Sequence, residues 1–237
     1  FLLSATLSAH LLNASPAKTV STAAYLKLDC AQPSGSFKDR GMAHMCKSLQ
    51  ADGATQIVSS SGGNAGLAAA TMGKRLGLDV RVIVPTTTKP LMLDKMRAQG
   101  ADVTIHGENW NAADELARTL VDESDGKAAY VPPFEDPLLW EGHSTIVDEL
   151  AADGVKPGAI VASVGGGGLL CGLLLGLRRH GWDDVDVYAA ETEGACCFAA
   201  GFEAGKPVRL DAITSVATSL GALAVSPNAL RLANEHG

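Results

Sequence analysis

The chain has 237 residues, of which 46% are hydrophobic, only 5% are aromatic and 26 are glycines. A formal net charge of −7 and the lack of any clustered Lys/Arg run give no support for nucleic-acid binding. Five cysteines without CxxC spacing argue against a disulfide framework and favour a reducing, cytosolic setting, and neither paired metal-ligand histidines nor an apolar run long enough to cross a bilayer occurs.

The hydrophobic pattern predicts alternating strands and helices. Short runs rich in β-branched residues predict strands at 24–28, 56–60, 80–84, 102–106, 159–163 and 185–191. Helical spacing occurs at 64–77, 88–100, 109–123 and 169–181, and three of these four stretches end in glycine, a natural helix C-cap. Because strand and helix recur about every 25 residues, we expect right-handed βαβ units and a parallel sheet. The segment PPFEDPLLW at 132–140 interrupts this pattern and is predicted to cross between two lobes.

Three strand-to-helix junctions have an unusual composition, and ligands of open α/β sheets collect at such junctions. The first, QPSGSFKDRG at 32–41, places Lys38 after a Ser/Gly-rich loop, at the expected first turn of a helix. The second, SSSGGNAG at 59–66, offers the Ser61 hydroxyl, the Asn64 amide and several backbone N–H donors, which suit a carboxylate or a ring oxygen.

The third junction, SVGGGGLL at 163–170, contains four consecutive glycines. Glycines can turn successive backbone N–H groups toward one point, and the helix expected to start near Leu169 adds its positive dipole end, so the loop can cradle a phosphate. It is not a Walker A loop, because no GK[ST] closes it, and it does not keep the GxGxxG spacing of a dinucleotide fingerprint.

Each junction also has a plainer explanation. Most lysines are solvated, a serine can simply cap a helix, and a glycine run can be a tight turn. Their coincidence in one chain favours a shared ligand. Pyridoxal phosphate needs a lysine for its Schiff base and a cradle for its phosphate, and the donor-rich loop suits its ring or the substrate carboxylate.

The sequence resembles the fold-type II pyridoxal-phosphate enzymes (tryptophan synthase beta-like superfamily), most closely their L-serine dehydratase, or serine/threonine ammonia-lyase, branch. The matching segments follow the order of that branch and cover nearly the whole chain: YLKLDCAQPSGSFKDRG, SSSGGNAGLAAA, VIVPTTT, YVPPFEDPLLWEGHSTIVDEL, SVGGGGLLCGLLLGL, ETEGACCFAAGFEAGKPVRL and ITSVATSLGA.

The resemblance implies an α/β fold with two lobes of open, mostly parallel twisted sheets flanked by helices. It implies a discontinuous large cofactor-binding domain of residues 1–40 and 136–237 and a small domain of residues 41–135. It also implies a further C-terminal part beyond Gly237, which in relatives supplies a final strand and the Cys or Ser that pairs with the pyridine nitrogen.

The resemblance also implies a role for each site residue. Lys38 is expected to be the catalytic lysine that forms the Schiff base, with Phe37 against the pyridine ring and Asn64 bonded to the 3-hydroxyl oxygen. The substrate carboxylate is assigned to Ser61, Gly62, Gly63 and Asn64, and the phosphate to Gly165, Gly166, Gly167, Gly168 and Leu169. A monovalent cation such as K⁺ is assigned to Glu191, Ala195, Leu220 and Ala222.

The implied activity is α,β-elimination of L-serine, with L-threonine as a second candidate substrate, to a 2-keto acid and ammonia. We expect a cytoplasmic homodimer with no nucleic-acid or membrane partner. Burial beside a ring is expected to lower the pKa of Lys38, so that its neutral amine can remove the α-proton.

Other functions stay open at this point. The alternatives are threonine deaminase, serine racemase, a β-replacing enzyme of the cysteine-synthase type, and an inactive relative that binds pyridoxal phosphate or a partner. Racemases of this family carry a serine where Gly62 stands, which counts against racemisation. The intact Lys38 counts against an inactive relative, whereas the C-terminal part expected beyond Gly237 but absent from this sequence counts in favour of one. Close relatives carry Ala or Gly at the Gly62 position, and we expect the smaller residue to slacken the substrate pocket. Cys197 falls where some relatives carry serine near the cation site.

Overall fold

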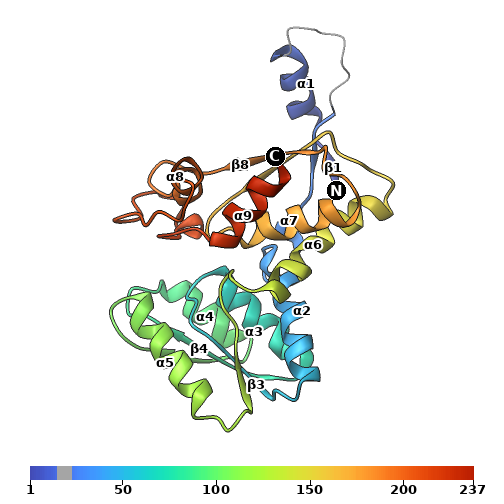
Figure 1. The fold of residues 1–237 in the computed structure, drawn as a ribbon. Coiled ribbons are helices and arrows are strands. Elements are labelled where there is room, and N and C mark those ends of the chain that lie inside the picture. Colours follow the sequence, from blue (N-terminus) through green and yellow to red (C-terminus); the bar gives the residue numbers. More distant parts are fainter. Residues whose placement is uncertain (15–22) are drawn as a thin grey trace.

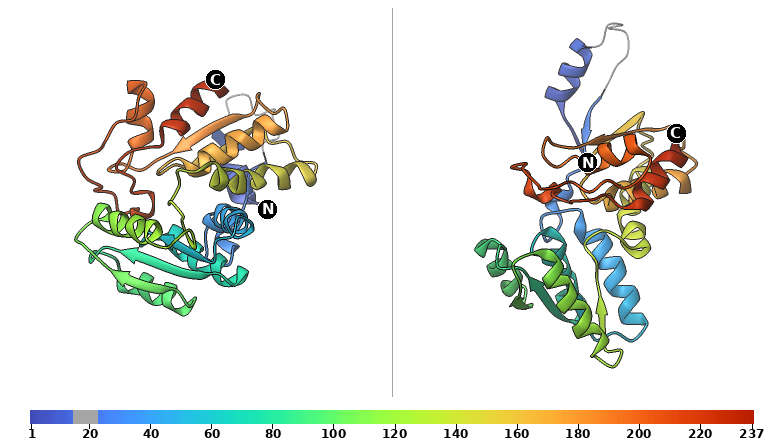
Figure 2. Two further views of the ribbon diagram at one scale, coloured as in Figure 1. Left: turned by 60° about the horizontal axis from the view of Figure 1, so that its bottom comes forward. Right: turned by 60° about the vertical axis from the view of Figure 1, so that its left-hand side comes forward.

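A computed structural model describes residues 1–14 and 23–237, which form two lobes (Figure 1). Strand β1 (Leu2–Leu3) pairs antiparallel with β2 (Tyr25–Leu26), and helix α1 (Ala5–Ala14) projects away from the rest of the chain, as the right-hand view of Figure 2 also shows. Residues 15–22, part of the predicted domain segment 1–40, lie outside the described residues. No helix among the described residues combines the length and apolar character needed to span a membrane.

The lower lobe in Figure 1 is built on four parallel strands in the order β5-β4-β3-β6. They are β3 (Gln56–Ser59), β4 (Asp79–Val84), β5 (Asp102–Ile105) and β6 (Ala128–Tyr130). Its helices are α2 (Lys38–Ala51), α3 (Asn64–Leu76), α4 (Pro90–Ala98) and α5 (Trp110–Asp122). Because side chains alternate along a strand, Ile57 packs with α2 and α3 while its neighbour Val58 packs with α5 on the opposite face.

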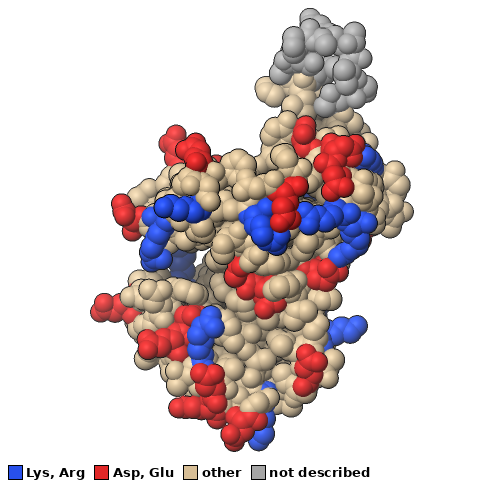
Figure 3. Space-filling view, in the orientation of Figure 1, with Lys and Arg blue, Asp and Glu red and all other residues tan. Residues whose placement is uncertain are grey.

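The upper lobe holds a parallel pair of strands, β7 (Ala159–Ser163) and β8 (Asp186–Ala190). Its helices are α6 (Pro137–Ala152), α7 (Gly168–Arg179), α8 (Cys197–Ala204) and α9 (Pro227–His236), and short 3-10 turns occur at Asp29–Ala31 and Thr218–Leu220. On the face shown in Figure 3, basic and acidic side chains are interspersed over both lobes, which gives no support for a nucleic-acid surface there.

The predicted alternation of strands and helices and the parallel sheets are confirmed. The strand predicted at 24–28 is reduced to the two residues of β2, and β6 was not predicted. The segment 132–140, predicted to cross between two lobes, leads from β6 of the lower lobe into α6, which begins at Pro137. The Asp136 carboxylate accepts a hydrogen bond of 2.8 Å from the Leu138 N–H, and proline fits the first helical turn, so the same residues start a helix.

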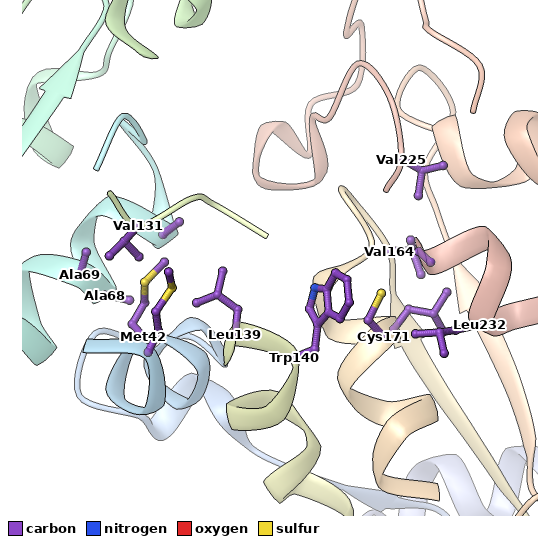
Figure 4. Close-up of a cluster of buried hydrophobic side chains, with 14 of the residues drawn as sticks. Met42, Ala68, Ala69, Val131, Leu139, Trp140, Val164, Cys171, Val225 and Leu232 are labelled. Atoms are coloured by element: carbon purple, nitrogen blue, oxygen red, sulfur yellow. The ribbon is translucent and has the colours of Figure 1, made fainter. Parts of the chain in front are cut away.

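One hydrophobic cluster spans the two lobes (Figure 4). Met42, Ala68, Ala69 and Val131 contribute from the lower lobe, Leu139 and Trp140 from α6, and Val164, Cys171, Val225 and Leu232 from the rest of the upper lobe. Since α6 supplies the residues in the middle, its position relative to its neighbouring helices determines how the lobes meet.

Glycines allow α6 to lie very close to both α2 and α7. A Cβ on Gly142 of α6 would lie 2.6 Å from the Cα of Gly41 in α2. A Cβ on Gly172 of α7 would lie 2.9 Å from the Trp140 carbonyl oxygen, and one on Gly176 would lie 2.7 Å from the Val147 Cβ. Because real Cβ atoms do not approach so closely, these helices can pack at this separation only with glycine at these positions.

We therefore expect Gly142→Ala to destabilise the protein. Alanine gains about 1 kcal/mol of helix propensity over glycine, but its methyl group would overlap backbone atoms of α2, so we expect a net loss of about 1–3 kcal/mol. The free energy of unfolding in urea measures the effect. Gly158→Ala is the matched control, since a Cβ there meets no atom within 4 Å and the free energy should change by no more than about 0.5 kcal/mol. Equal stability of the two variants would contradict this account of the packing.

Candidate functional site

The candidate site is assembled around the segment Pro133–Phe134, which leads from β6 into α6. The Nζ of Lys38, the first residue of α2, donates a hydrogen bond to the Pro133 carbonyl oxygen. On the other side, a Cβ on Gly166 would lie 2.5 Å from ring atoms of Phe134, and one on Gly168 would lie 2.9 Å from the Phe134 carbonyl oxygen. The lysine and the glycine loop, 127 positions apart in the sequence at their nearest (165 − 38), therefore contact neighbouring residues of one segment.

The loop at 59–64 leaves the same edge of the sheet. Strands β3 and β6 are parallel neighbours in register at Val58 and Tyr130, and the Val131 N–H donates a hydrogen bond of 2.8 Å to the Val58 carbonyl oxygen. Because both strands end here, the Ser/Gly/Asn loop and the Pro133–Phe134 segment start side by side. The Ser/Gly/Asn loop thus begins beside the segment that contacts both Lys38 and the glycine loop.

Lys38 has the properties of a reactive amine. It is half-buried, and its Nζ lies 5.1 Å from the centroid of the Phe37 ring. Burial lowers the pKa of Lys38 from 10.5 to about 8, because a charged ammonium loses hydration when it is buried. An appreciable fraction of the amine is therefore neutral near pH 8, and a neutral amine can act as a nucleophile or as a base.

The start of α2 is anchored by an ion-pair cluster. The Arg40 guanidinium donates to both carboxylate oxygens of Asp29, at 2.8 and 2.9 Å, and to Glu149 of α6 at 2.6 Å. Hydrogen bonds from Arg40 lower the pKa of Glu149 to about 2, so the carboxylate remains charged at neutral pH. This bidentate geometry holds the backbone that carries Lys38 against α6.

His143 of α6 lies behind Phe37, and the sequence analysis did not single it out. Its ring is fully buried, its centroid lies 5.0 Å from that of Phe37 in an edge-to-face arrangement, and neither ring nitrogen has a hydrogen-bond partner among the described residues. Burial, with the nearby positive charges of Lys38 and Arg40, holds the pKa of His143 well below its usual value. The ring is therefore neutral and packs against Phe37.

The Ser/Gly/Asn loop is not a helix cap formed by serine, which was the plainer explanation of its sequence. The N-cap of α3 is Gly63, and no side chain caps that helix; the Ser61 hydroxyl instead accepts a hydrogen bond of 3.3 Å from the Gly63 N–H. Asn64 begins α3 and is exposed. A Cβ on Gly62 would lie 2.6 Å from the Thr88 hydroxyl oxygen, so Thr88 takes up the space that a larger residue at position 62 would need.

The glycine loop leaves a set of backbone donors free. Gly167 has a φ of +97°, in the left-handed region that favours glycine, and it is the N-cap of α7. The first intrahelical bond of α7 runs from the Cys171 N–H to the Gly167 carbonyl oxygen, and within residues 1–14 and 23–237 no acceptor is found for the N–H groups of residues 165–170. Every α-helix leaves its first four N–H groups without an intrahelical partner, and Gly165 and Gly166 add two more donors here, so an anion could be bound at this helix N-terminus.

The four residues assigned to a cation lie near α8 and the Thr218–Leu220 turn. The Glu191 carboxylate accepts hydrogen bonds from the backbone N–H groups of Phe198, at 2.9 Å, and Ala199, at 2.8 Å, and so satisfies the N-terminus of α8. Ala195 and Ala222 donate their N–H groups to the carbonyl oxygens of Thr192 and Leu220. No hydrogen bond joins Glu191 to the other three, and the described part of the chain contains no cluster of three or more His, Cys, Asp or Glu residues suited to a metal ion.

Comparisons with known proteins point to one family. Residues 9–237 match the family described as pyridoxal-phosphate dependent enzyme. Over 220 residues the chain is 50% identical to the human L-serine dehydratase/L-threonine deaminase, covering 92% of this chain and 67% of that protein. An L-serine dehydratase of Saccharomyces cerevisiae is 42% identical, over 90% of this chain and 68% of the relative.

Solved structures agree with these sequence matches. The fold is similar to that of an L-serine ammonia-lyase from Rhizomucor miehei, with a TM-score of 0.86 and 37% identity over 99% of this chain and 72% of that one.

The pKa of Lys38 can be tested by chemical modification of the protein without added ligand. Only a neutral amine reacts with an acylating reagent, so the rate of acylation at Lys38 should rise with pH and level off above a midpoint of about 8. Exposed lysines provide the internal control, because an ammonium in water loses its proton near pH ~10.4. Mass spectrometry of the peptides measures both rates, and a midpoint for Lys38 equal to that of the exposed lysines would contradict the effect of burial.

Proposed function

The chain belongs to the family of pyridoxal-phosphate dependent enzymes, and we propose that it is an L-serine ammonia-lyase that converts L-serine to a 2-keto acid and ammonia. L-Threonine is proposed as the second substrate. The observation that carries the proposal is the Lys38 amine, whose pKa is lowered to about 8. It contacts the same segment as a glycine loop whose backbone N–H groups have no acceptor among the described residues. The names of the relatives and of the fungal enzyme support the choice of serine.

The residues present fit the cofactor. The unpaired N–H groups of residues 165–170 supply the donors that a phosphate needs, and a side chain on Gly166 would fill space already taken by Phe134. We assign the phosphate to Gly165, Gly166, Gly167, Gly168 and Leu169, and the cofactor's carbonyl carbon to the Nζ of Lys38. When bound, pyridoxal phosphate supplies an electron-withdrawing ring that spreads the negative charge left at the α-carbon of the substrate.

The protein residues orient the reactants and move the proton. We assign Phe37 to the face of the cofactor ring, since α6 holds its side chain through His143, and Asn64 to the 3-hydroxyl oxygen of the ring. Lys38 Nζ would be the base that takes the α-proton of the substrate, because burial keeps a fraction of the amine neutral.

The substrate carboxylate is assigned to the loop formed by Ser61, Gly62, Gly63 and Asn64. Its donors are the Ser61 hydroxyl, the Asn64 amide and backbone N–H groups. Thr88 bounds this loop at Gly62, so the pocket suits a short side chain such as the hydroxymethyl group of serine. Thr88 fills part of the extra space that the glycine at position 62 was expected to leave in the substrate pocket.

Domain organisation and cellular context form further parts of the proposal. We propose a large cofactor-binding domain of residues 1–40 and 136–237, a small domain of residues 41–135, and a cytoplasmic homodimer. The resemblance supports a monovalent cation at Glu191, Ala195, Leu220 and Ala222. Both Glu191 carboxylate oxygens already accept hydrogen bonds from backbone N–H groups. We therefore propose that most of the cation's ligands would be the backbone carbonyl oxygens of the other three residues.

The central test of the proposal is Lys38→Ala. Removal of the amine should abolish the visible absorption of the bound cofactor and lower ammonia release from L-serine by at least ~10³-fold, since both anchoring and proton transfer are lost. Lys47→Ala, at an exposed position of the same helix, should change neither. Circular dichroism checks the fold of both variants. Retention of both properties by a folded Lys38→Ala protein would rule out the proposed role.

The second test concerns the substrate. We expect kcat/KM for elimination to be highest with L-serine and lower with L-threonine, whose extra methyl group must fit beside Thr88. Steady-state measurements of keto-acid formation give both values. Faster turnover of O-acetylserine with sulfide than of L-serine would favour a β-replacing enzyme instead, and rapid conversion of L-serine to D-serine would favour a racemase.

A further inference from the structure

A buried hydrogen-bond network lies directly behind the loop assigned to the substrate carboxylate. Ser60 connects the end of β3 to that loop, and it is fully buried. Its hydroxyl donates to the Asp114 Oδ1 at 2.8 Å and lies 2.9 Å from the Tyr130 hydroxyl. A hydroxyl with these partners faces the protein interior, so Ser60 has a different role from the neighbouring Ser61.

Asp114 is the centre of this network. It lies on α5, and its Oδ1 accepts hydrogen bonds from both Ser60 and Tyr130, while its Oδ2 accepts one of 2.8 Å from the Nε of Arg118. The Arg118 guanidinium carbon also lies 4.2 Å from the centroid of the Tyr130 ring. The side chain of Asp114 is only 13% exposed, compared with 56% for Arg118, so the arginine closes the outer side of the network.

The charges of the network are well defined. Burial alone would raise the pKa of Asp114, but hydrogen bonds from Tyr130, Arg118 and Ser60 hold it below its usual value. Burial and the hydrogen bond to Asp114 raise the pKa of Tyr130. Asp114 is therefore an anion at neutral pH and Tyr130 keeps its proton, so each hydroxyl has one proton to donate to the same carboxylate.

The network connects the loop to the two elements on its far side. Tyr130 ends β6, the neighbour of β3, and Asp114 belongs to the helix that covers the face of Val58. Beyond Ser60 the loop contains two glycines, and its hydrogen bonds to the described residues run from the Gly63 N–H to the Ser61 hydroxyl and from the Leu67 N–H to the Gly63 carbonyl oxygen. Glycine allows a wide range of backbone dihedral angles. The hydrogen bonds that fix Ser60 therefore help to set the direction in which the loop leaves the sheet.

We propose that Asp114 and Tyr130 are positioning residues that fix Ser60 and thereby orient the loop at 61–64 toward a carboxylate. The inference rests on the proposed function, because it takes the substrate to be an amino acid bound through its carboxylate by this loop. Neither residue contacts the ligand itself. The network makes carboxylate binding depend on side chains 54 and 70 positions from Ser60 in the sequence.

The test compares two ligands that differ in the carboxylate. Glycine has an amine and a carboxylate but no leaving group, and ethanolamine has the amine and hydroxymethyl group of serine but no carboxylate. Their binding to the cofactor-loaded protein is titrated by the visible absorption of the cofactor in wild type, Asp114→Asn and Tyr130→Phe. One buried hydrogen bond contributes about 1 kcal/mol, so each variant should bind glycine about 5- to 10-fold more weakly. Affinity for ethanolamine and for pyridoxal phosphate should stay within about twofold.

Asp102→Asn is the matched control, because it removes an exposed carboxylate paired with Arg81 in the same lobe, away from the loop. It should leave both affinities unchanged. The urea midpoint of each variant is measured in parallel, and Tyr130→Phe keeps the ring and its packing if Asp114→Asn proves too unstable to purify. Unchanged glycine affinity in folded Tyr130→Phe, or an equal loss for ethanolamine, would overturn the proposal. The titrations measure binding and need no turnover. If the wild type did not deaminate serine, the proposed function would be rejected, but the binding data would still test the role of Asp114 and Tyr130.

Discussion

The close contact of α6 with α2 and α7 is the constraint on which the rest of the site depends. Glycines at 41 and 142 bring α2 against α6, and glycines at 172 and 176 bring α7 against its other side. The N-terminus of α2 carries Lys38 and the N-terminus of α7 carries the glycine loop, while the segment that enters α6 contacts both. Larger residues at these glycines would push the helices apart, and with them the helix N-termini that carry the amine and the backbone donors.

This packing also explains why the ring of His143 is buried and has no hydrogen-bond partner among the described residues. His143 lies against both neighbouring helices, since a Cβ on Gly41 of α2 would lie 2.8 Å from its Nε2 and one on Gly172 of α7 would lie 3.0 Å from the His143 carbonyl carbon. A buried polar group without a partner costs about 1–3 kcal/mol, so the ring lowers the stability of the folded state. In return its edge fixes Phe37, which precedes Lys38. The protein thus tolerates a local cost in stability next to the residue whose position matters most for the proposed chemistry.

Much of the fold was predictable from the sequence because its signals are local. The alternation of β-branched runs and helical stretches, the glycines after the helices and the three unusual junctions all lie within short windows. Strand β6 was missed because three residues are too few to show a period, and the start of α6 was taken for part of a crossing because its Pro137 also suits a loop. The roles of His143, Asp114 and Tyr130 could not be predicted, because each depends on contacts between residues far apart in the chain.

The two lobes divide the proposed work of the site between them. The donors proposed for the phosphate lie in the glycine loop and the first turn of α7 in the upper lobe, and the loop proposed for the carboxylate lies in the lower lobe, next to the Asp114 network. Lys38 lies where the lobes meet: it begins α2, and its Nζ donates a hydrogen bond to the Pro133 carbonyl oxygen in the segment that leads into α6. Substitutions in the lower sheet and α5 can therefore change how an amino acid is oriented without altering the backbone donors of the glycine loop. Substitutions at the glycines between α2, α6 and α7 would instead affect both parts of the proposed site, because they would displace the amine and the proposed phosphate donors together.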